Sequence, residues 1–192
     1  MRQLLLISAL AVSLSGCGIN SVPTAEEEAK GRWADVESSY QRRADLIPNL
    51  VATAKGFAAQ ERDVLESVTR ARASATQTTI SADDLTDPAK MQQFQQAQGE
   101  LSGALSRLLV TVEKYPELRS NENFLMLQTQ LEGTENRIGI ARRDYNAAVQ
   151  AYNTEVRTFP SLIAARYIYG AEPMQTFEAT TEGAEEAPVV EF

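Results

Sequence analysis

Apolar side chains recur every three or four residues through most of the chain, which is the spacing of one face of an α-helix. The first stripe comprises Trp33, Val36, Tyr40, Ile47, Leu50, Ala54, Phe57, Val64 and Val68. Thr24 and Glu27 have the spacing of a capping box, so the pattern predicts that the first helix begins at Thr24.

Pro48 interrupts this first stripe. It lacks the N–H that would bond the Ala44 carbonyl, and it biases Ile47 away from the helical region. An unbroken helix over residues 24–76 would be about 80 Å long at 1.5 Å per residue, and no later segment matches that length. We therefore predict a helix break with a turn at residues 46–48. Because the apolar phase survives Pro48, a single helix kinked there is the alternative.

Two further long helices follow a loop at residues 77–87. Asp87-Pro88 provides an N-cap and a first-turn proline, and Ser120 or Asn121 caps the last long helix. The stripe of the earlier helix comprises Met91, Phe94, Leu101, Leu105, Leu108, Val112 and Tyr115. The stripe of the later one comprises Phe124, Leu127, Leu131, Ile138, Tyr145 and Tyr152, and a short helix is expected over residues 161–169.

Each of these helices has one apolar stripe and is not apolar all round, so the stripes are buried by packing against one another. The pattern predicts an all-α domain over residues 24–170, folded as an up-and-down antiparallel four-helix bundle. The alternative is a three-helix bundle whose long first helix is kinked at Pro48. Residues 171–192 contain six glutamates and no basic residue, so we predict an acidic flexible tail.

The N-terminal residues have the pattern of a signal peptide. Arg2 precedes an uncharged apolar run that is too short to span a bilayer. The run ends in Leu14-Ser15-Gly16-Cys17, which resembles the lipobox of bacterial lipoproteins. That resemblance implies a signal peptide over residues 1–16, cleavage after Gly16, acylation of Cys17 and a short tether over residues 17–23. An ordinary secretory signal with a chance cysteine is the alternative.

Gly18 stands where lipoproteins retained in the inner membrane have aspartate. The resemblance therefore implies an envelope protein anchored by lipid in the outer membrane and facing the periplasm. In a cell with a single membrane, the same signal implies the cell surface.

Composition and charge argue against several classes of function. The chain has 192 residues, of which 43% are hydrophobic and 23% charged, as expected for one globular domain. Its net charge of -8 argues against nucleic acid as a partner. Without histidine it has no Ser-His-Asp triad and no imidazole metal ligand. No phosphate-binding loop or nucleophile elbow is present, so we expect neither an enzyme nor a cofactor.

Polar side chains form the least usual feature of the predicted helices. They recur at steps of three, four and seven along the last helix and also flank Pro48. We name this set the polar seam; it comprises Arg43, Asp45, Asn49, Glu132, Glu135, Asn136, Arg142, Tyr145, Asn146 and Asn153. We interpret it as pairing across helices that fixes their register. The alternative is a groove for a small charged ligand or a partner helix. Its carboxylates are too few for a metal cage, so we predict no metal site.

Four motifs in order resemble the LemA family of bacterial envelope proteins. They are Arg42-Arg43-x-Asp45-Leu46-Ile47-Pro48-Asn49-Leu50, Tyr115-Pro116-x-Leu118, Leu131-x-Gly133-Thr134-Glu135-Asn136-Arg137-Ile138, and the Tyr-Asn pairs at 145–146 and 152–153. Phe177-Glu178 in the tail is also similar to the family. The resemblance implies an up-and-down four-helix bundle held at the membrane by its N-terminus, and it implies no reaction. Many members use a transmembrane helix there, from which the lipobox departs.

These observations together predict a membrane-anchored envelope lipoprotein that acts as a helical binding or scaffold module for other envelope proteins. The alternative function is a sensor of a small ligand or divalent ion that uses the polar seam.

Overall fold

The computed structural model describes residues 20–178. Outside the described residues lie the predicted signal peptide with its cleavage site at Gly16, and also Cys17 and Gly18. Residues 179–192 of the predicted tail lie outside them as well.

Four long helices make up most of the described chain. They are α2 (Ser21–Phe57), α3 (Arg62–Gln77), α4 (Pro88–Val112) and α6 (Glu122–Arg157). Shorter elements are a 3₁₀ turn η1 (Ala82–Asp84), α5 (Pro116–Arg119), α7 (Ser161–Ala164) and a π-helical turn η2 (Ala165–Tyr169). Residues 20–178 contain no strand, so the predicted all-α class is confirmed.

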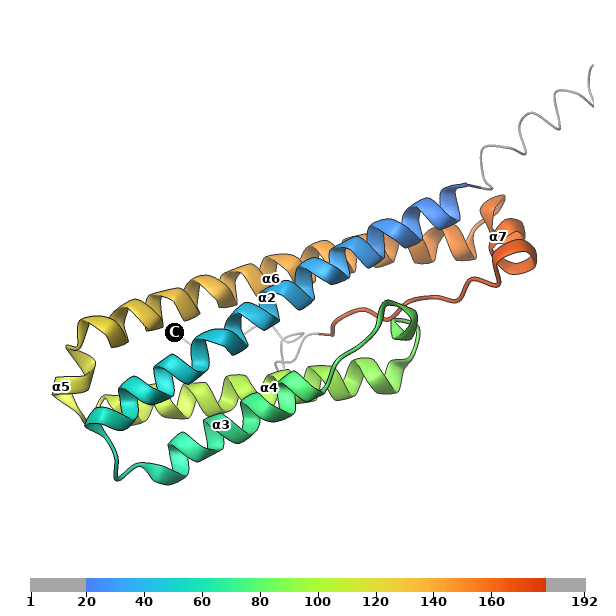
Figure 1. The fold of residues 1–192 in the computed structure, drawn as a ribbon. Coiled ribbons are helices and arrows are strands. Elements are labelled where there is room, and N and C mark those ends of the chain that lie inside the picture. The colour runs from blue at the N-terminus through green and yellow to red at the C-terminus, as the bar shows by residue number, and fades with distance from the viewer. Residues whose placement is uncertain (1–19, 179–192) are drawn as a thin grey trace, which may run out of the picture.

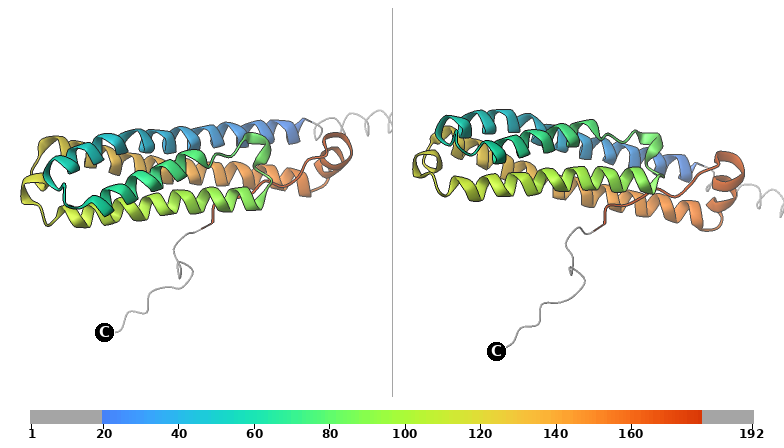
Figure 2. Two further views of the ribbon diagram at one scale, coloured as in Figure 1. Left: turned by 60° about the horizontal axis from the view of Figure 1, so that its bottom comes forward. Right: turned by 90° about the horizontal axis from the view of Figure 1, so that it is seen from below.

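The long helices pack in pairs, α2 along α6 and α3 along α4, and α2 also contacts α3 (Figure 1). α2 and α4 run in one direction and α3 and α6 in the other, which gives an elongated molecule in all views (Figure 2). α2 has 37 residues and α6 has 36, so each is about 55 Å long. Within residues 20–178, no helix is both long and apolar enough to cross a bilayer.

The predicted turn at residues 46–48 is wrong, because α2 continues through Pro48 to Phe57. The chain reverses instead between Phe57 and Arg62. Two features explain the continuous helix. α6 matches the whole length of α2, so no part of its apolar stripe lacks a partner. The carbonyl of Ala44, which Pro48 leaves without a helical donor, accepts a hydrogen bond from Arg72 Nε of α3 at 2.7 Å.

The start of α2 also differs from the prediction. Ser21 to Pro23 belong to the helix rather than to a tether, and the Thr24 hydroxyl donates to the Asn20 carbonyl at 2.7 Å instead of capping a helix. The predicted starts of the two later long helices are confirmed: the side chains of Asp87 and Asn121 cap α4 and α6. The predicted short helix appears as α7 and η2, and Gly170 ends it with a left-handed φ of 60°.

The buried apolar side chains form two separate clusters along the molecule. One surrounds Trp33 and Tyr145 near the start of α2, and the other surrounds Leu50 and Leu101 near its end. Between them lies a polar level that contains Arg43, which is 1% exposed. We call this level the Arg43 layer and define it as Arg43, Gln98, Ser102 and Glu135.

Residues 171–178, which we call the C-terminal segment, do not behave as the predicted flexible tail. The segment returns from η2 along α6 in the direction opposite to that helix (Figure 1). Met174 and Phe177 are buried, and both belong to the apolar cluster around Trp33. Apolar side chains with a specific place in the core therefore outweigh the acidic composition of this part of the tail.

Candidate functional site

Six of the ten residues of the polar seam belong to two structural sites, the Arg43 layer and a row of contacts between α6 and the C-terminal segment. The Arg43 layer joins the four long helices. Arg43 Nη1 donates to Glu135 Oε1 at 2.7 Å and to Ser102 Oγ at 2.9 Å, while Nη2 donates to Gln98 Oε1. Gln98 Nε2 in turn donates to the Ala75 carbonyl of α3 at 3.2 Å. One buried guanidinium thus connects α2 to α4 and α6, and through Gln98 to α3.

Burial in the Arg43 layer is very uneven. The Arg43 side chain is 2% exposed, whereas that of Glu135 is 47% exposed. The guanidinium also lies 4.9 Å from the centre of the Tyr40 ring. Within the described residues, the buried Nε of Arg43 has no hydrogen-bond partner. The free-energy cost of removing charge from water in this layer therefore falls mainly on Arg43. Its buried charge is stabilised only while the Glu135 carboxylate and the Gln98 amide remain in place.

The second site binds the backbone of the C-terminal segment through two asparagines of α6. Asn146 Nδ2 donates to the Phe177 carbonyl at 3.0 Å, and Asn146 Oδ1 accepts from the Phe177 N–H at 2.9 Å. Asn153 makes the same pair of bonds with Met174, both at 2.9 Å. Each carboxamide thus satisfies both backbone groups of one residue, as a neighbouring strand does in an antiparallel sheet.

Two tyrosines next to these asparagines continue the row. The Tyr145 hydroxyl donates to the Gln175 carbonyl at 2.9 Å, and the Tyr152 hydroxyl donates to the Glu172 carbonyl at 3.1 Å. We call Tyr145, Asn146, Tyr152 and Asn153 with their four partners the Tyr-Asn ladder.

The spacing of the ladder has a simple geometric basis. The step of seven residues from one Tyr-Asn pair to the next advances about 10.5 Å along a helix. The backbone partners of each residue type lie three residues apart, and three extended residues span about 10 Å. A seven-residue repeat on α6 therefore matches a three-residue repeat on an extended chain that runs antiparallel to it.

Phe177 anchors the end of this segment in the core. Its ring stacks 5.9 Å from that of Trp33 and packs edge-on against Tyr145 at 5.7 Å. The Arg142 guanidinium lies 4.6 Å from the centre of the Phe177 ring and donates to the Glu178 carbonyl at 3.1 Å.

Gln175 ties the segment to the loop before α4. Its N–H donates to the Leu85 carbonyl at 2.8 Å, and its amide donates to the Thr86 carbonyl at 3.2 Å. The C-terminal segment is thus held from two sides, by α6 and by this loop.

Burial changes the acidity of the ladder tyrosines. It raises the pKa of Tyr145, and it raises the pKa of Tyr152 to about 12, with smaller contributions from the negative charges of Glu26 and Glu172. Both hydroxyls therefore stay protonated, and able to donate, to a higher pH than an exposed tyrosine does.

The remaining residues of the polar seam belong to neither site. Asp45 accepts a hydrogen bond from Gln41 of its own helix, and Glu132 accepts one from Gln128. Asn49 and Asn136 are exposed. Four residues of the seam therefore lie outside both sites, although sequence spacing places them beside residues that belong to them.

Sequence reasoning missed Gln98, Ser102 and the C-terminal segment as partners of the seam. Gln98 lies in the apolar stripe of its helix, four residues after Phe94 and three before Leu101, so its place in the stripe could have identified it as a buried polar residue. Nothing in the sequence distinguishes Ser102. The seven-residue repeat of the Tyr-Asn pairs could have indicated the C-terminal segment as their partner. Met174 and Phe177 are three residues apart in the tail, and three extended residues match the length of seven helical ones.

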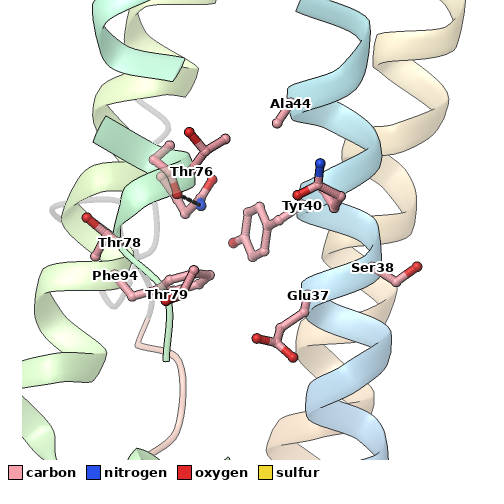
Figure 3. A pocket seen from close by; sticks show the side chains of 11 residues that line it. Glu37, Ser38, Tyr40, Ala44, Thr76, Thr78, Thr79 and Phe94 are labelled. Carbon is pink, nitrogen blue, oxygen red and sulfur yellow. Dashed lines mark hydrogen bonds between the residues drawn. The ribbon is translucent and has the colours of Figure 1, made fainter. Parts of the chain in front are cut away.

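A cavity of about 320 Å³ lies on the other side of Tyr40, between α2, the end of α3 and α4. Its lining combines hydroxyl groups and one carboxylate with apolar side chains; Figure 3 shows the Tyr40 ring pointing across it toward the threonines. The lining residues include Glu37, Tyr40, Thr76, Thr78, Thr79, Phe94 and Gln98. Burial raises the pKa of Glu37, and a smaller hydrogen-bonding effect of the Trp33 indole lowers it. The cavity is suited to a small molecule that carries both apolar and hydrogen-bonding groups.

No group of three or more carboxylate, thiol or imidazole side chains in residues 20–178 is arranged to hold a metal ion. Glu135, one of the two seam glutamates at i, i+3, is paired with Arg43.

A known protein family resembles this chain over the region that contains both sites. The sequence model of the LemA family matches residues 32–192, a range that includes Arg43, the Tyr-Asn pairs and the C-terminal segment. The chain belongs to the LemA family. The family match thus extends through the segment that the Tyr-Asn ladder binds.

Individual relatives are distant. The magnetosome protein MamQ 2 of Paramagnetospirillum magneticum is 27% identical over 89% of this chain and 68% of its own length. MamQ of Magnetospirillum gryphiswaldense is 27% identical over 73% of this chain and 58% of its own length. The protein LemA of Metamycoplasma hominis is 21% identical over 73% of this chain and 60% of its own length. The chain thus spans less than two thirds of the last two relatives.

Proposed function

We propose that this LemA-family protein is a non-catalytic, lipid-anchored scaffold module that positions other envelope proteins close to the membrane. Membership of the family supports an envelope-associated protein, and neither the family description nor the names of the relatives denote an enzyme. The rigid part of the scaffold is an up-and-down antiparallel four-helix bundle of α2, α3, α4 and α6, and its partners are proteins rather than nucleic acid.

The use of the polar seam inside the molecule supports this proposal most strongly. Arg43 is buried and bonded to three side chains, and the two Tyr-Asn pairs bind the chain's own C-terminal segment. These groups stabilise one arrangement of the helices, as polar residues in helical bundles do. A stable rod about 55 Å long is suited to hold partners at a set distance from a surface.

In this proposal, Cys17 carries the lipid after cleavage at Gly16, and the protein faces the periplasm from the outer membrane. In a cell with a single membrane, it lies on the cell surface. We expect Cys17→Ser to release the protein from the membrane fraction. We expect Gly18→Asp to move the acylated protein from the outer to the inner membrane on a density gradient. Retention of a processed Cys17→Ser protein in the membrane would refute the lipid anchor.

The scaffold role itself is tested by crosslinking in cells. A photoreactive amino acid at Val110, which is 63% exposed near the end of α4, should capture defined envelope proteins. The same substitution in the Cys17→Ser chain is the matched control, because the fold is retained and only the anchor is lost. Identical capture by the anchored and released chains would contradict a scaffold that works at the membrane.

The cavity beside Tyr40 favours a second candidate function, the sensing of a small ligand. A ligand that binds only the folded state raises the melting temperature as its concentration increases. We would titrate divalent cations and small envelope metabolites against the native chain and a Glu37→Gln variant, with Glu132→Gln as the exposed control. A stabilisation that Glu37→Gln abolishes and Glu132→Gln preserves would favour the sensor over the scaffold.

A further inference from the structure

The end of the molecule formed by α7 and η2 is unusually apolar on its surface. Six large apolar side chains are exposed between residues 159 and 169, whereas the other exposed ones in residues 20–178 are scattered over three helices. We call these six the apolar tip: Phe159 (78% exposed), Leu162 (39%), Ile163 (53%), Tyr167 (78%), Ile168 (60%) and Tyr169 (42%). Large apolar side chains exposed this close together in the chain are typical of an interaction site.

The apolar tip lies at the end of the rod where the chain enters α2. The Ser21 hydroxyl donates to Glu155 Oε2 at 2.7 Å, which places the first residue of α2 beside the end of α6. α7 follows α6 directly and contacts α2 as well (Figure 1). The tip and the start of α2 are therefore neighbours.

The charge of the tip differs from that of the rest of the chain. Residues 157–170 contain Arg157 and Arg166 and no acidic residue, whereas the whole chain has a net charge of -8. Both arginines are exposed, and the Arg166 guanidinium lies 6.0 Å from the centre of the Tyr167 ring. Tyrosine, large aliphatic side chains and arginine together are the composition that favours the interfacial layer of a lipid bilayer.

We propose that the apolar tip inserts into the interfacial layer of the lipid bilayer that holds the acylated Cys17. This inference rests on the proposed lipid anchor. Four residue steps separate Cys17 from Ser21, so the anchor lies within about 14 Å of the start of α2 even when the chain is extended. The anchor thus keeps the tip at the membrane surface, where insertion removes its apolar side chains from water.

Insertion of the tip gives the rod a defined orientation. A lipid anchor alone leaves the domain free to swing about its tether. A second contact through the tip directs α2 and α6 away from the bilayer, so that the opposite end, with α5 and the loop between α2 and α3, projects toward partners.

Spin labelling of the acylated full-length chain in vesicles of phosphatidylcholine and phosphatidylglycerol tests the inference. Acylation consumes the only cysteine, so Ile168→Cys introduces a single reactive thiol. Ile140→Cys on α6, where the native side chain is 50% exposed, is the matched control. We expect the label at residue 168 to be relaxed more by oxygen than by a water-soluble nickel complex, and the label at residue 140 to show the opposite order.

The outcomes separate the anchor from the tip. If mass spectrometry finds no acyl group on Cys17, the anchor and the inference both fail. If Cys17 is acylated but the label at residue 168 is as accessible to nickel as the label at residue 140, only the inserted tip is overturned. Dipolar broadening between labels at residue 168 would also overturn it, since a second copy of the chain would then cover the tip.

Discussion

Arg72 Nε lies 2.7 Å from the carbonyl oxygen of Ala44, the group that Pro48 leaves without a donor in its own helix. The donor comes from α3, so a side chain of a neighbouring helix replaces the missing backbone N–H. This contact allows a proline in the interior of α2 without an unsatisfied carbonyl. It also ties α3 to α2 at a defined level.

A double-mutant cycle tests this relationship. We expect Arg72→Met to lower the free energy of unfolding by about 1.5 kcal/mol, because the Ala44 carbonyl loses a charged donor. In a Pro48→Ala background the helix supplies its own N–H, so the same substitution should cost clearly less. Denaturant unfolding measures both, with exposed Arg70→Met as the control. Equal losses in the two backgrounds would mean that the contact does not replace the helical bond.

The Tyr-Asn ladder predicts a local effect on the C-terminal segment. We expect Asn146→Ala to cost about 2 kcal/mol, because it removes two hydrogen bonds and leaves both backbone groups of Phe177 without partners. Hydrogen exchange should show faster exchange of the Phe177 amide. Asn136→Ala, at an exposed position on the same helix, should change stability by less than about 0.5 kcal/mol. Unchanged protection of Phe177 in the Asn146 variant would contradict the ladder.

The uneven burial of the Arg43 layer predicts which of two substitutions lowers the free energy of unfolding more. Glu135→Ala leaves a buried guanidinium without its carboxylate, and we expect a loss of about 3 kcal/mol. Arg43→Met should cost less, because Glu135 is half exposed and water then solvates its charge. Thermal and chemical unfolding give both values, with Glu132→Ala as the exposed control one turn away. If Arg43→Met proves the more damaging change, packing rather than charge pairing dominates the layer.

The ladder tyrosines predict an alkaline transition. The pKa of Tyr152 is about 12 in the folded protein and 10.0 ordinarily, so the unfolded chain loses this proton first as the pH rises. The stabilisation is therefore complete below pH 10 and is lost between pH 10 and 12. Burial raises the pKa of Tyr145 in the same direction.

Unfolding measured across this pH range should show a smaller loss of stability in Tyr152→Phe than in the native chain. Tyr167→Phe, at a position that is 78% exposed, should leave the loss unchanged. A native chain whose stability is constant up to pH 12 would show that the ladder tyrosines are not protected in the folded state.

The sequence by itself determined the helical class and most helix ends, because these depend on local chemistry. The apolar spacing of three and four residues, the caps at Asp87 and Asn121 and the stop at Gly170 all act within a few residues. The family also followed from local motifs, since each of them is a short stretch of the chain.

Only the tertiary structure decided what happens at Pro48 and in the tail. Local rules predict a break at Pro48, but a partner helix of matching length and a donor from Arg72 stabilise the continuous helix. Composition predicts a flexible tail, but Met174 and Phe177 are buried there and the Tyr-Asn pairs bind their backbone. These outcomes depend on contacts between residues 20 to 90 positions apart, whose free energies no local pattern contains.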